Sequence, residues 1–391
     1  MIGSTITKEL VSACCGVLVA FWAALPVEIY GDWIEPPLQT EEGYPVPRPN
    51  TRPEIPSAHG AHREYAIEWW YWVGHLESVE DGERFGFQST VFRLAGDSQR
   101  AGLKDGAVFG DRQLYMSHAA LSELSKGNYI HHERIYREGW QAYSATGSLD
   151  LKVGMIEASE LPNADGFSMR IHYENGSLLD LKMRPEKPLV SFGDRGLSRK
   201  GADPAAVSLY WTYTRLAVEG TLTRDGKVTP VQGISWMDHE ISSSQLGSDL
   251  EGWDWTAIQL DDGTEVKAYR LRKNDGGSDP WSAVYWIDTN SKVSRVYAKD
   301  FRWIEETFWE SPETGLDYPT RVRIEVIHPN TLETMVYVLS PILDTQEFVG
   351  NDGSNAYWEG ACEVFDAKGK RIGLAYLELA GYGGGLGARL D

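Results

Sequence analysis

The sequence has few cysteines and none of the common metal or nucleotide motifs. Of its three cysteines, Cys14 and Cys15 lie near the amino terminus, and Cys362 is the only thiol in the rest of the chain. One thiol cannot form an internal disulfide, and no Cys/His spacing of a zinc site occurs. A Gly-x-Ser-x-Gly elbow, a His-Glu-x-x-His motif, a phosphate loop and a dinucleotide fingerprint are also lacking. We therefore expect neither a metal nor a cofactor.

Basic residues are scarce as well. The chain has 37 Lys and Arg residues against 57 Asp and Glu residues, which gives a formal net charge of −20. No Lys/Arg-rich run interrupts this acidic balance. The electrostatic field of this negative charge repels phosphate backbones and anionic membranes, so we do not expect nucleic acid as a partner.

No apolar run reaches the length of about 20 residues that a membrane-spanning helix needs. The longest, Val11 to Leu25, has fifteen residues, which is typical of a signal-peptide core. We predict that residues 1–30 are a signal peptide or an uncleaved N-terminal anchor. The protein would then be exported to the periplasm or the outside, with membrane contact only through this segment. The Pro-rich residues 31–64 are expected to be an extended linker.

Patterns typical of β-strands dominate the rest of the chain. Apolar residues alternate, as at Leu209, Trp211 and Tyr213, which indicates strands with one buried face. Asp-Gly pairs such as Asp225-Gly226 recur at short intervals and favour tight hairpin turns. No amphipathic helix of more than three turns is evident. The pattern predicts an all-β protein built from antiparallel barrels or sandwiches.

We divide this region into two tandem β-barrels, residues 65–234 and 235–384, followed by a flexible tail at 385–391. About eight strands make a barrel just wide enough for one small ligand. The chain contains fifteen Trp and nineteen Tyr residues, which suit a wall around a ligand, although two barrel cores need many aromatics too. The expected partner is a small hydrophobic molecule, while the oligomeric state is not predicted.

The first polar cluster is Glu68-Trp69-Trp70-Tyr71. On a strand, Glu68 and Trp70 share one face while Trp69 and Tyr71 share the other. A Glu68 facing a cavity would be desolvated, its pKa would rise, and it could donate a proton near neutral pH. The alternative is an ion pair with a structural arginine such as Arg93.

The second cluster is Trp236-Met237-Asp238-His239-Glu240. A histidine beside carboxylates can shift a proton between pH 5 and 8, but neighbours on a strand point to opposite sides. The alternative is a bend of the sheet held by side-chain hydrogen bonds. Among the other histidines, His118 lies in an apolar strand and is expected to be buried. We expect His59, His62, His131 and His132 to be exposed.

The third cluster is Gly252-Trp253-Asp254-Trp255, a carboxylate between two indoles. Indole faces stabilise cations within about 6 Å, so an acid beside them suits a reaction with a carbocation-like intermediate. The alternative is a barrel strand with one buried aspartate whose hydrogen bonds are satisfied.

These clusters, together with LYMSHAALSEL at 114–124, LSRKGADP at 197–204 and YWEGACEVF at 357–365, resemble the carotenoid 1,2-hydratases and their AttH-like relatives. The resemblance covers residues 59–384 and is closer to the relatives, which are usually labelled predicted secreted hydrolases. It implies two tandem lipocalin-like barrels. It also implies cofactor-free hydration of an alkene, in which an acid protonates the double bond, aromatic rings shield the cation and water adds.

In this resemblance His239 matches the histidine of an Asp-His motif, with Asp238 and Trp236 in the expected flanking places. Two features depart from the hydratase pattern. Ile241 stands where an aromatic is expected, and the strand at 266–271 has Tyr269 but no aspartate. The matched residues therefore do not specify a carotenoid as the substrate.

Taken together, the sequence predicts an exported protein that hydrates or hydrolyses an isoprenoid, carotenoid or lipid-like substrate with acid assistance. The alternatives are a non-catalytic carrier of a hydrophobic ligand and a pericyclase-like cavity that folds its substrate into a reactive shape. The candidate catalytic residues are His239, Asp238, Asp254 and Glu68, and the candidate substrate-binding residues are Trp69, Trp70, Tyr71, His118, Trp236, Trp253, Trp255 and Tyr269.

Overall fold

A computed structural model of the chain describes residues 33–96, 113–244, 246–247, 249–351, 353 and 355–384. The chain divides into the units Met1–Glu35 and Pro36–Asp391. The expected signal segment or anchor (1–30) and the tail (385–391) lie outside the described residues. Within the described ranges, no helix is both long and apolar enough to cross a membrane.

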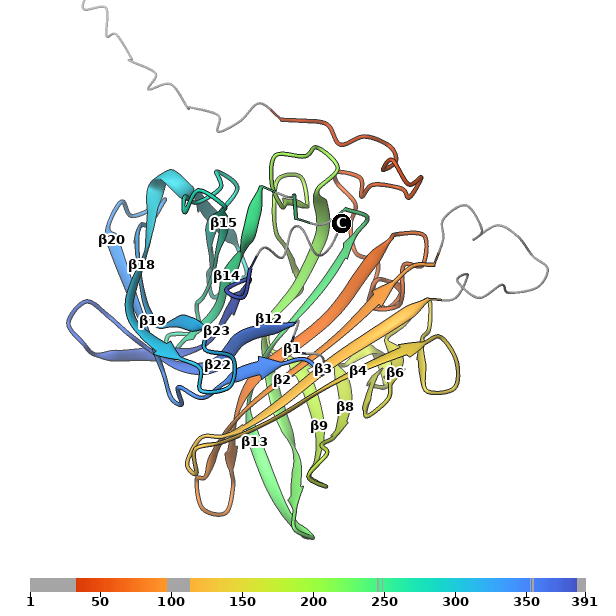
Figure 1. The fold of residues 1–391 in the computed structure, drawn as a ribbon, viewed down its shortest axis with the longest axis vertical. Coiled ribbons are helices and arrows are strands. Elements are labelled where there is room, and N and C mark those ends of the chain that lie inside the picture. The colour runs from red at the N-terminus through yellow and green to blue at the C-terminus, as the bar shows by residue number, and fades with distance from the viewer. Residues whose placement is uncertain are drawn as a thin grey trace, which may run out of the picture. The chain divides into compact units, whose positions relative to one another are not determined.

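Most of the unit Pro36–Asp391 forms two antiparallel sheets, which confirms the predicted all-β class (Figure 1). The first, 13-stranded sheet has the order β4-β3-β2-β1-β13-β12-β9-β8-β7-β6-β5, with β10 and β11 paired to β12. Its strands are β1 (Ile67–Ser78), β2 (Arg84–Leu94), β3 (Leu114–Glu123), β4 (Asn128–Arg137), β5 (Ala142–Ser144), β6 (Asp150–Val153), β7 (Ile156–Glu160), β8 (Phe167–His172), β9 (Leu178–Pro185), β10 (Val190–Ser191), β11 (Leu197–Arg199), β12 (Val207–Arg224) and β13 (Lys227–Ser242). Two short 3-10 turns accompany it, η1 (Ser57–His59) and η2 (Pro162–Ala164).

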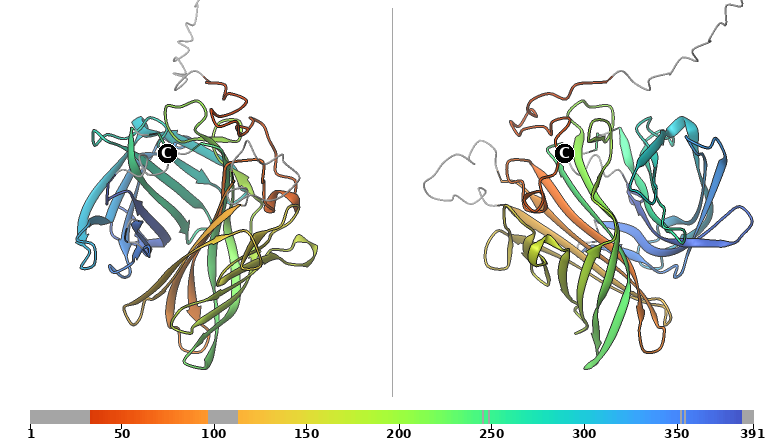
Figure 2. Two further views of the ribbon diagram at one scale, coloured as in Figure 1. Left: turned by 45° about the vertical axis from the view of Figure 1, so that its right-hand side comes forward. Right: turned by 180° about the vertical axis from the view of Figure 1, so that it is seen from behind.

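The second, 10-stranded sheet has the order β17-β16-β15-β14-β23-β22-β20-β19-β18, with β21 paired to β22. Its strands are β14 (Leu250–Leu260), β15 (Glu265–Lys273), β16 (Ala283–Ile287), β17 (Val293–Tyr297), β18 (Phe301–Glu310), β19 (Asp317–Ile327), β20 (Thr334–Pro341), β21 (Glu347–Val349), β22 (Ala356–Phe365) and β23 (Arg371–Ala380). The 3-10 turn η3 (Ala298–Asp300) joins the two end strands, and the sheet curves nearly into a barrel (Figure 2).

The hairpin between β12 and β13 shows how local sequence sets the register. Asp225 and Gly226 have φ angles of 49° and 78°, the left-handed pair that a two-residue hairpin turn needs, and Arg224 pairs with Lys227. From this turn β13 runs to Ser242, pairing with β12 on one side and β1 on the other. The change of sheet lies between Ser242 and Leu250, so the boundary predicted at 234–235 falls inside β13.

The segment expected to be an extended linker is partly packed into the fold. Ala58, His59 and Ala61 are buried, and the Trp70 indole donates a hydrogen bond to the His59 carbonyl (2.9 Å). The Ala61 amide donates to the carbonyl of Ala145. These backbone groups find partners only in the folded sheet, so the end of the 31–64 segment belongs to the first sheet's core rather than to a linker.

Buried side chains form three layers because strand residues alternate between two faces. One layer fills the concave side of each sheet, and a third lies between the sheets, where β1 meets β23, β2 meets β22 and β12 meets β14. We call this third cluster the intersheet layer; its apolar members are Tyr71, Val73, Val190, Phe192, Tyr210, Trp236, Leu246, Leu250, Trp255, Ala257, Tyr269, Leu271, Ala283, Tyr285, Ile287, Ala361 and Tyr376. Most of the predicted aromatic site residues lie here or at its edge.

Candidate functional site

Successive side chains of β13 point to opposite faces of the sheet, so the strand separates two polar clusters. On one face, Trp236 packs in the intersheet layer and its indole donates a hydrogen bond to Asp238. On the other face, His239 stacks on Trp70 of the first sheet's core. The ring centroids of Trp70 and His239 are 4.9 Å apart. The Asp238–His239 pair that the sequence suggested as one catalytic unit is therefore divided between the two faces of the strand.

The cluster on the His239 face is centred on Glu68. His62 Nδ1 lies 2.9 Å and His239 Nε2 lies 2.8 Å from Glu68 Oε1, and Arg93 Nε donates to Oε2 at 2.8 Å. Glu68 and Arg93 are both fully buried. This is the arrangement that was given above as the alternative, an ion pair with Arg93.

The charge states of this cluster do not suit acid catalysis. Burial raises the pKa of Glu68, but hydrogen bonds from His239 and His62 and the charge of Arg93 outweigh it and hold the pKa well below the ordinary value. The expected rise of this pKa is therefore wrong. Burial lowers the pKa of His239 to about 4, so its imidazole is neutral at pH 7. An ionised Glu68 has no proton to donate.

His62, Glu68 and His239 form a group of potential metal ligands, with ligand atoms within 4.8 Å of one another. The Arg93 guanidinium binds the same carboxylate and already neutralises it. A cation placed there would be repelled by this fixed positive charge. The donor set therefore fits a buried hydrogen-bond network better than a metal site.

Several histidine predictions are wrong. His59 is 3% exposed and His132 is 4% exposed, although both were expected on the surface. His62 and His131 are half-buried. His59 Nδ1 lies 3.0 Å from a Glu160 oxygen, and burial lowers the pKa of this histidine too. The 58–61 segment carries the His59 ring inward, which the proline-rich composition did not indicate, and His132 is buried on β4.

Asp254 lies apart from both clusters. Its carboxylate is bound by Arg270 (2.6 Å from Nε), by Arg272 and by the Tyr382 hydroxyl (3.0 Å). The side chain is fully buried, while Trp253 and Trp255, its neighbours, pack in the intersheet layer or at its edge. This is the satisfied buried aspartate of the alternative interpretation.

Within the intersheet layer, Asp238 accepts hydrogen bonds from the Tyr210 hydroxyl (2.6 Å), the Trp236 indole (2.8 Å) and Thr212. Burial raises the pKa of Asp238, and the hydrogen bonds from Thr212, Tyr210 and Trp236 oppose that rise. Beside it, Glu240 is bound by Lys200 at 2.9 Å, and burial raises its pKa as well.

Two further carboxyl groups, which the sequence analysis did not single out, enter from the second sheet. Glu359 on β22 and Glu378 on β23 are direct cross-strand partners. Glu359 is 2% exposed, and Glu378 is half-buried. The Tyr71 hydroxyl of β1 donates to Glu359 at 2.6 Å. Burial and the neighbouring Glu378 raise the pKa of Glu359 well above its ordinary value, and burial raises that of Glu378 to about 7.

Aromatic rings surround these carboxyl groups. Trp255 lies 5.3 Å from Tyr71 and 6.2 Å from Trp236, measured between ring centroids, and its indole donates to the Tyr210 hydroxyl at 3.2 Å. The structure thus brings together Tyr71, Trp236, Trp255 and Tyr269 from the predicted set, with Trp69 and Trp253 packed at the edge. Trp70 is not among them, because it faces the other side of β1.

His118 lies at the far end of the same interface. Its Nδ1 is 2.9 Å from the Tyr357 hydroxyl and its Nε2 is 3.2 Å from a Glu133 oxygen. Tyr357 occupies β22 two residues before Glu359, on the same face of the strand. His118 is 2% exposed, which confirms the predicted buried state, and burial lowers its pKa. Its ring also packs against Phe348, with the ring centroids 4.4 Å apart.

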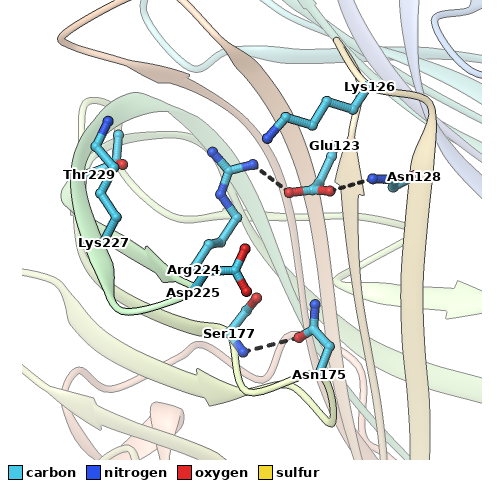
Figure 3. A pocket seen from close by; sticks show the side chains of 9 residues that line it. All are labelled: Glu123, Lys126, Asn128, Asn175, Ser177, Arg224, Asp225, Lys227 and Thr229. Atoms are coloured by element: carbon cyan, nitrogen blue, oxygen red, sulfur yellow. Dashed lines mark hydrogen bonds and ion pairs between the residues drawn. The ribbon is translucent and has the colours of Figure 1, made fainter.

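A pocket of about 490 Å³ opens among the turns of the first sheet (Figure 3). Its lining is polar, and Arg224 within it pairs with Glu123 and with Glu83. None of the candidate site residues lines this pocket, so it is not the aromatic-lined cavity that the sequence predicted. The lining residues are Glu123, Lys126, Asn128, Asn175, Ser177, Arg224, Asp225, Lys227 and Thr229.

Comparisons with known proteins agree on the fold. The AttH-like family matches residues 46–382. An AttH protein of Nitrosomonas europaea has 31% identity and a TM-score of 0.74, covering 84% of this chain and 97% of its own. Kievitone hydratase of Nectria haematococca has 13% identity and a TM-score of 0.60, covering 88% and 97%, and CghA bound to Sch210972 has 11% and 0.51, covering 80% and 88%.

A search of curated proteins finds no match. The similarities to kievitone hydratase and CghA concern the fold alone, because the identities are low. The family match spans most of the chain, and the lipocalin-like fold implied by the sequence motifs is confirmed. The protein belongs to the AttH-like family.

Proposed function

We propose that the protein is an exported, cofactor-free enzyme that adds water to, or hydrolyses, a hydrophobic substrate in the intersheet layer. The Glu359–Glu378 pair supplies the proton. The observation that carries this proposal is the cross-strand position of two carboxyl groups, the buried Glu359 and the half-buried Glu378, beside the Tyr71, Trp236 and Trp255 rings.

Two adjacent carboxyl groups, one of them buried, cannot both ionise at low cost, and both pKa values are raised, so the pair retains a proton near neutral pH. The Tyr71 hydroxyl donates to Glu359 Oε1, which leaves the other oxygen of this carboxyl available to carry and deliver the proton. Protonation of an isolated double bond creates a cation, and indole and phenol faces stabilise cations at short range. The proton donor and the aromatic rings that would stabilise the cation therefore lie in the same part of the intersheet layer.

The role of Asp238 differs from the one first suggested. Its two oxygens accept three hydrogen bonds, so the carboxylate is held rigidly beside the Tyr210 hydroxyl. A fixed negative charge of this kind stabilises a developing cation. His239 and Glu68 are assigned to the support of the first sheet. The shared fold of kievitone hydratase favours water addition among reactions of this class.

The test is turnover in isotopically labelled water. The purified full chain is incubated in H₂¹⁸O with a panel of acyclic isoprenoid alkenes and isoprenoid esters, and products are analysed by mass spectrometry. We expect an alcohol or acid that carries one ¹⁸O atom. Binding seen as quenching of tryptophan fluorescence, with no labelled product from any bound compound, would support a carrier instead. A rearranged product of unchanged mass would support a pericyclase-like cavity.

Tyr71→Phe is expected to slow product formation up to about tenfold, because a hydrogen bond between uncharged groups contributes about 0.5–1.5 kcal/mol. The matched control is Tyr382→Phe, which removes the hydroxyl of a half-buried tyrosine that donates to Asp254 on the other face of the second sheet. Initial rates of both variants are compared with wild type. Equal rates in all three proteins would show that the Tyr71 hydroxyl does not assist the reaction.

Asp254→Asn should leave turnover unchanged while lowering stability. The substitution weakens the ion pairs with Arg270 and Arg272, whose side chains are only 13% and 10% exposed. We expect a loss of about 1–3 kcal/mol in the free energy of unfolding. Urea unfolding gives the stability and the ¹⁸O assay gives the rate; a large loss of rate in a folded variant would return Asp254 to the catalytic set.

A further inference from the structure

Lys267, on β15, is a buried amine in a box of aromatic rings. Its Nζ lies 3.2 Å from the ring centroid of Tyr210 and 4.1 Å from that of Phe192. The rings of Tyr269 and Tyr285 follow at 5.3 and 5.5 Å. Lys267 is 0% exposed, and among the described residues its Nζ has no hydrogen-bond partner.

This environment differs from that of a lysine with a structural role. Lys187, in the same region of the fold, donates to the Gly263 carbonyl (2.6 Å), to Glu265 (2.7 Å) and to the Asp288 carbonyl (2.9 Å). A buried ammonium normally has such acceptors, because leaving its protons unpaired is costly. Lys267 lacks them. The ring faces attract a cation, but burial opposes the charge and lowers the pKa of Lys267 well below its ordinary value, which favours the neutral amine.

A neutral amine has a lone pair, which makes it a nucleophile toward carbonyl carbon. Two groups beside Lys267 can accept and donate the protons that move in such a reaction. Asp238 is close enough to interact electrostatically with Lys267, and Tyr210 connects the two, since its hydroxyl donates to Asp238 while its ring faces Nζ. The amine, the carboxyl and the phenol therefore form one unit.

We propose that Lys267 captures the carbonyl group of an apolar aldehyde or ketone as an imine. This inference rests on the same intersheet layer as the proposed function and names the chemical class of its ligand. The box of rings around Nζ selects an apolar body, and the amine selects the carbonyl. Surface lysines offer neither the walls nor the neutral amine.

The reaction balances without any co-reactant. The Lys267 nitrogen lone pair attacks the carbonyl carbon, and the carbonyl π electrons move to oxygen, which takes one of the two nitrogen protons. The second nitrogen proton passes through the Asp238–Tyr210 unit to the hydroxyl of this carbinolamine, the hydroxyl leaves as water, and a C=N bond forms. Addition of water to the imine reverses the steps and releases the carbonyl compound and the free amine.

The test is reductive trapping on the full chain at neutral pH. The protein is mixed with citral, an apolar acyclic aldehyde, and with cyanoborohydride, which reduces an imine to a stable secondary amine. Intact-mass spectrometry counts the adducts and peptide mapping locates them. We expect one adduct, on Lys267, that is lost in Lys267→Met. Lys227→Met, which removes an exposed lysine that pairs with Glu80, is the matched control and should keep the adduct.

The mapping is done on wild-type protein, so the result does not depend on the folding of the Lys267 variant. An adduct spread over surface lysines, or one equally strong in folded Lys267→Met, would overturn the proposal. Glu359→Gln separates the two hypotheses: it should abolish hydration but keep the Lys267 adduct. Trapping without turnover in wild type would refute the proposed enzyme and leave the carbonyl site standing, whereas turnover without trapping would do the opposite.

Discussion

Glu378→Gln is expected to make the protein more stable at alkaline pH and at the same time nearly inactive. Burial raises the pKa of Glu378 from an ordinary value of 4.5 to about 7. At pH 9 the wild-type side chain must ionise inside the intersheet layer, facing Glu359 across the strand pair. A glutamine has the same shape and accepts the same hydrogen bond from Trp253 without carrying the charge.

The sign of the pH dependence follows from linkage. A carboxyl whose pKa is higher in the folded than in the unfolded protein binds protons better when folded, so stability falls as pH rises from about 4.5 through 7. Each tenfold change in proton affinity corresponds to about 1.4 kcal/mol, which puts the penalty above pH 7 on the order of 3 kcal/mol. Glu378→Gln removes this penalty, so its advantage should be present at pH 9 and nearly absent at pH 5.

The same substitution removes half of the proposed acid. Loss of a positioned general acid typically reduces the rate by about 10²–10⁴-fold, and we expect a loss in this range for Glu378→Gln and for Glu359→Gln. The matched control is Glu325→Gln on β19, whose carboxylate binds Arg302 on the outer face of the second sheet. Urea unfolding at pH 5 and pH 9 and the labelled-water assay measure both effects. Unchanged activity with raised stability would show that the carboxyl pair is not the acid.

Alternation along strands was enough to predict much of the fold. Glu68 and Trp70 were expected on one face of a strand with Tyr71 on the other, and this is confirmed, since Trp70 packs in the first core and Tyr71 in the intersheet layer. The Asp225-Gly226 hairpin was likewise specified locally. The period-two pattern assigns side chains to the two faces of a strand, but it does not predict which face packs against the second sheet.

The acid pair could not be found in this way because it depends on register between distant segments. Glu359 and Glu378 become cross-strand partners only through the turn that joins β22 to β23. One signal was present: both carboxylates lie in mostly apolar strands, Glu359 in YWEGACEVF, which also contains Glu363, and Glu378 in LAYLELA. Asking which charged residues lie in apolar strands, rather than which lie beside a histidine, would have selected both of them. It would not have selected Lys267, because its strand, EVKAYRLRK, carries several other charges.

Arg93→Met should cost the protein about 3–5 kcal/mol, because it leaves Glu68 as a buried charge without its cation. Arg93 is fully buried and its guanidinium also donates to Gln113 and to the carbonyls of His62 (3.1 Å) and Tyr65 (2.9 Å). These bonds tie the 58–65 segment to the first sheet. Native domains are stable by only about 5–15 kcal/mol, so the expected loss is a large share of the total.

The double variant Arg93→Met/Glu68→Gln separates the charge from the packing. If the unpaired carboxylate causes most of the loss, replacing it by an amide should recover part of the stability, even though the bonds from Arg93 to His62 and Tyr65 stay broken. The surface control is Arg302→Met, whose side chain is 73% exposed and which should change stability by less than about 0.5 kcal/mol. Urea unfolding at pH 7 measures all three. A double variant as unstable as the single one would mean that the backbone contacts of Arg93, rather than its pairing with Glu68, hold this part of the first sheet together.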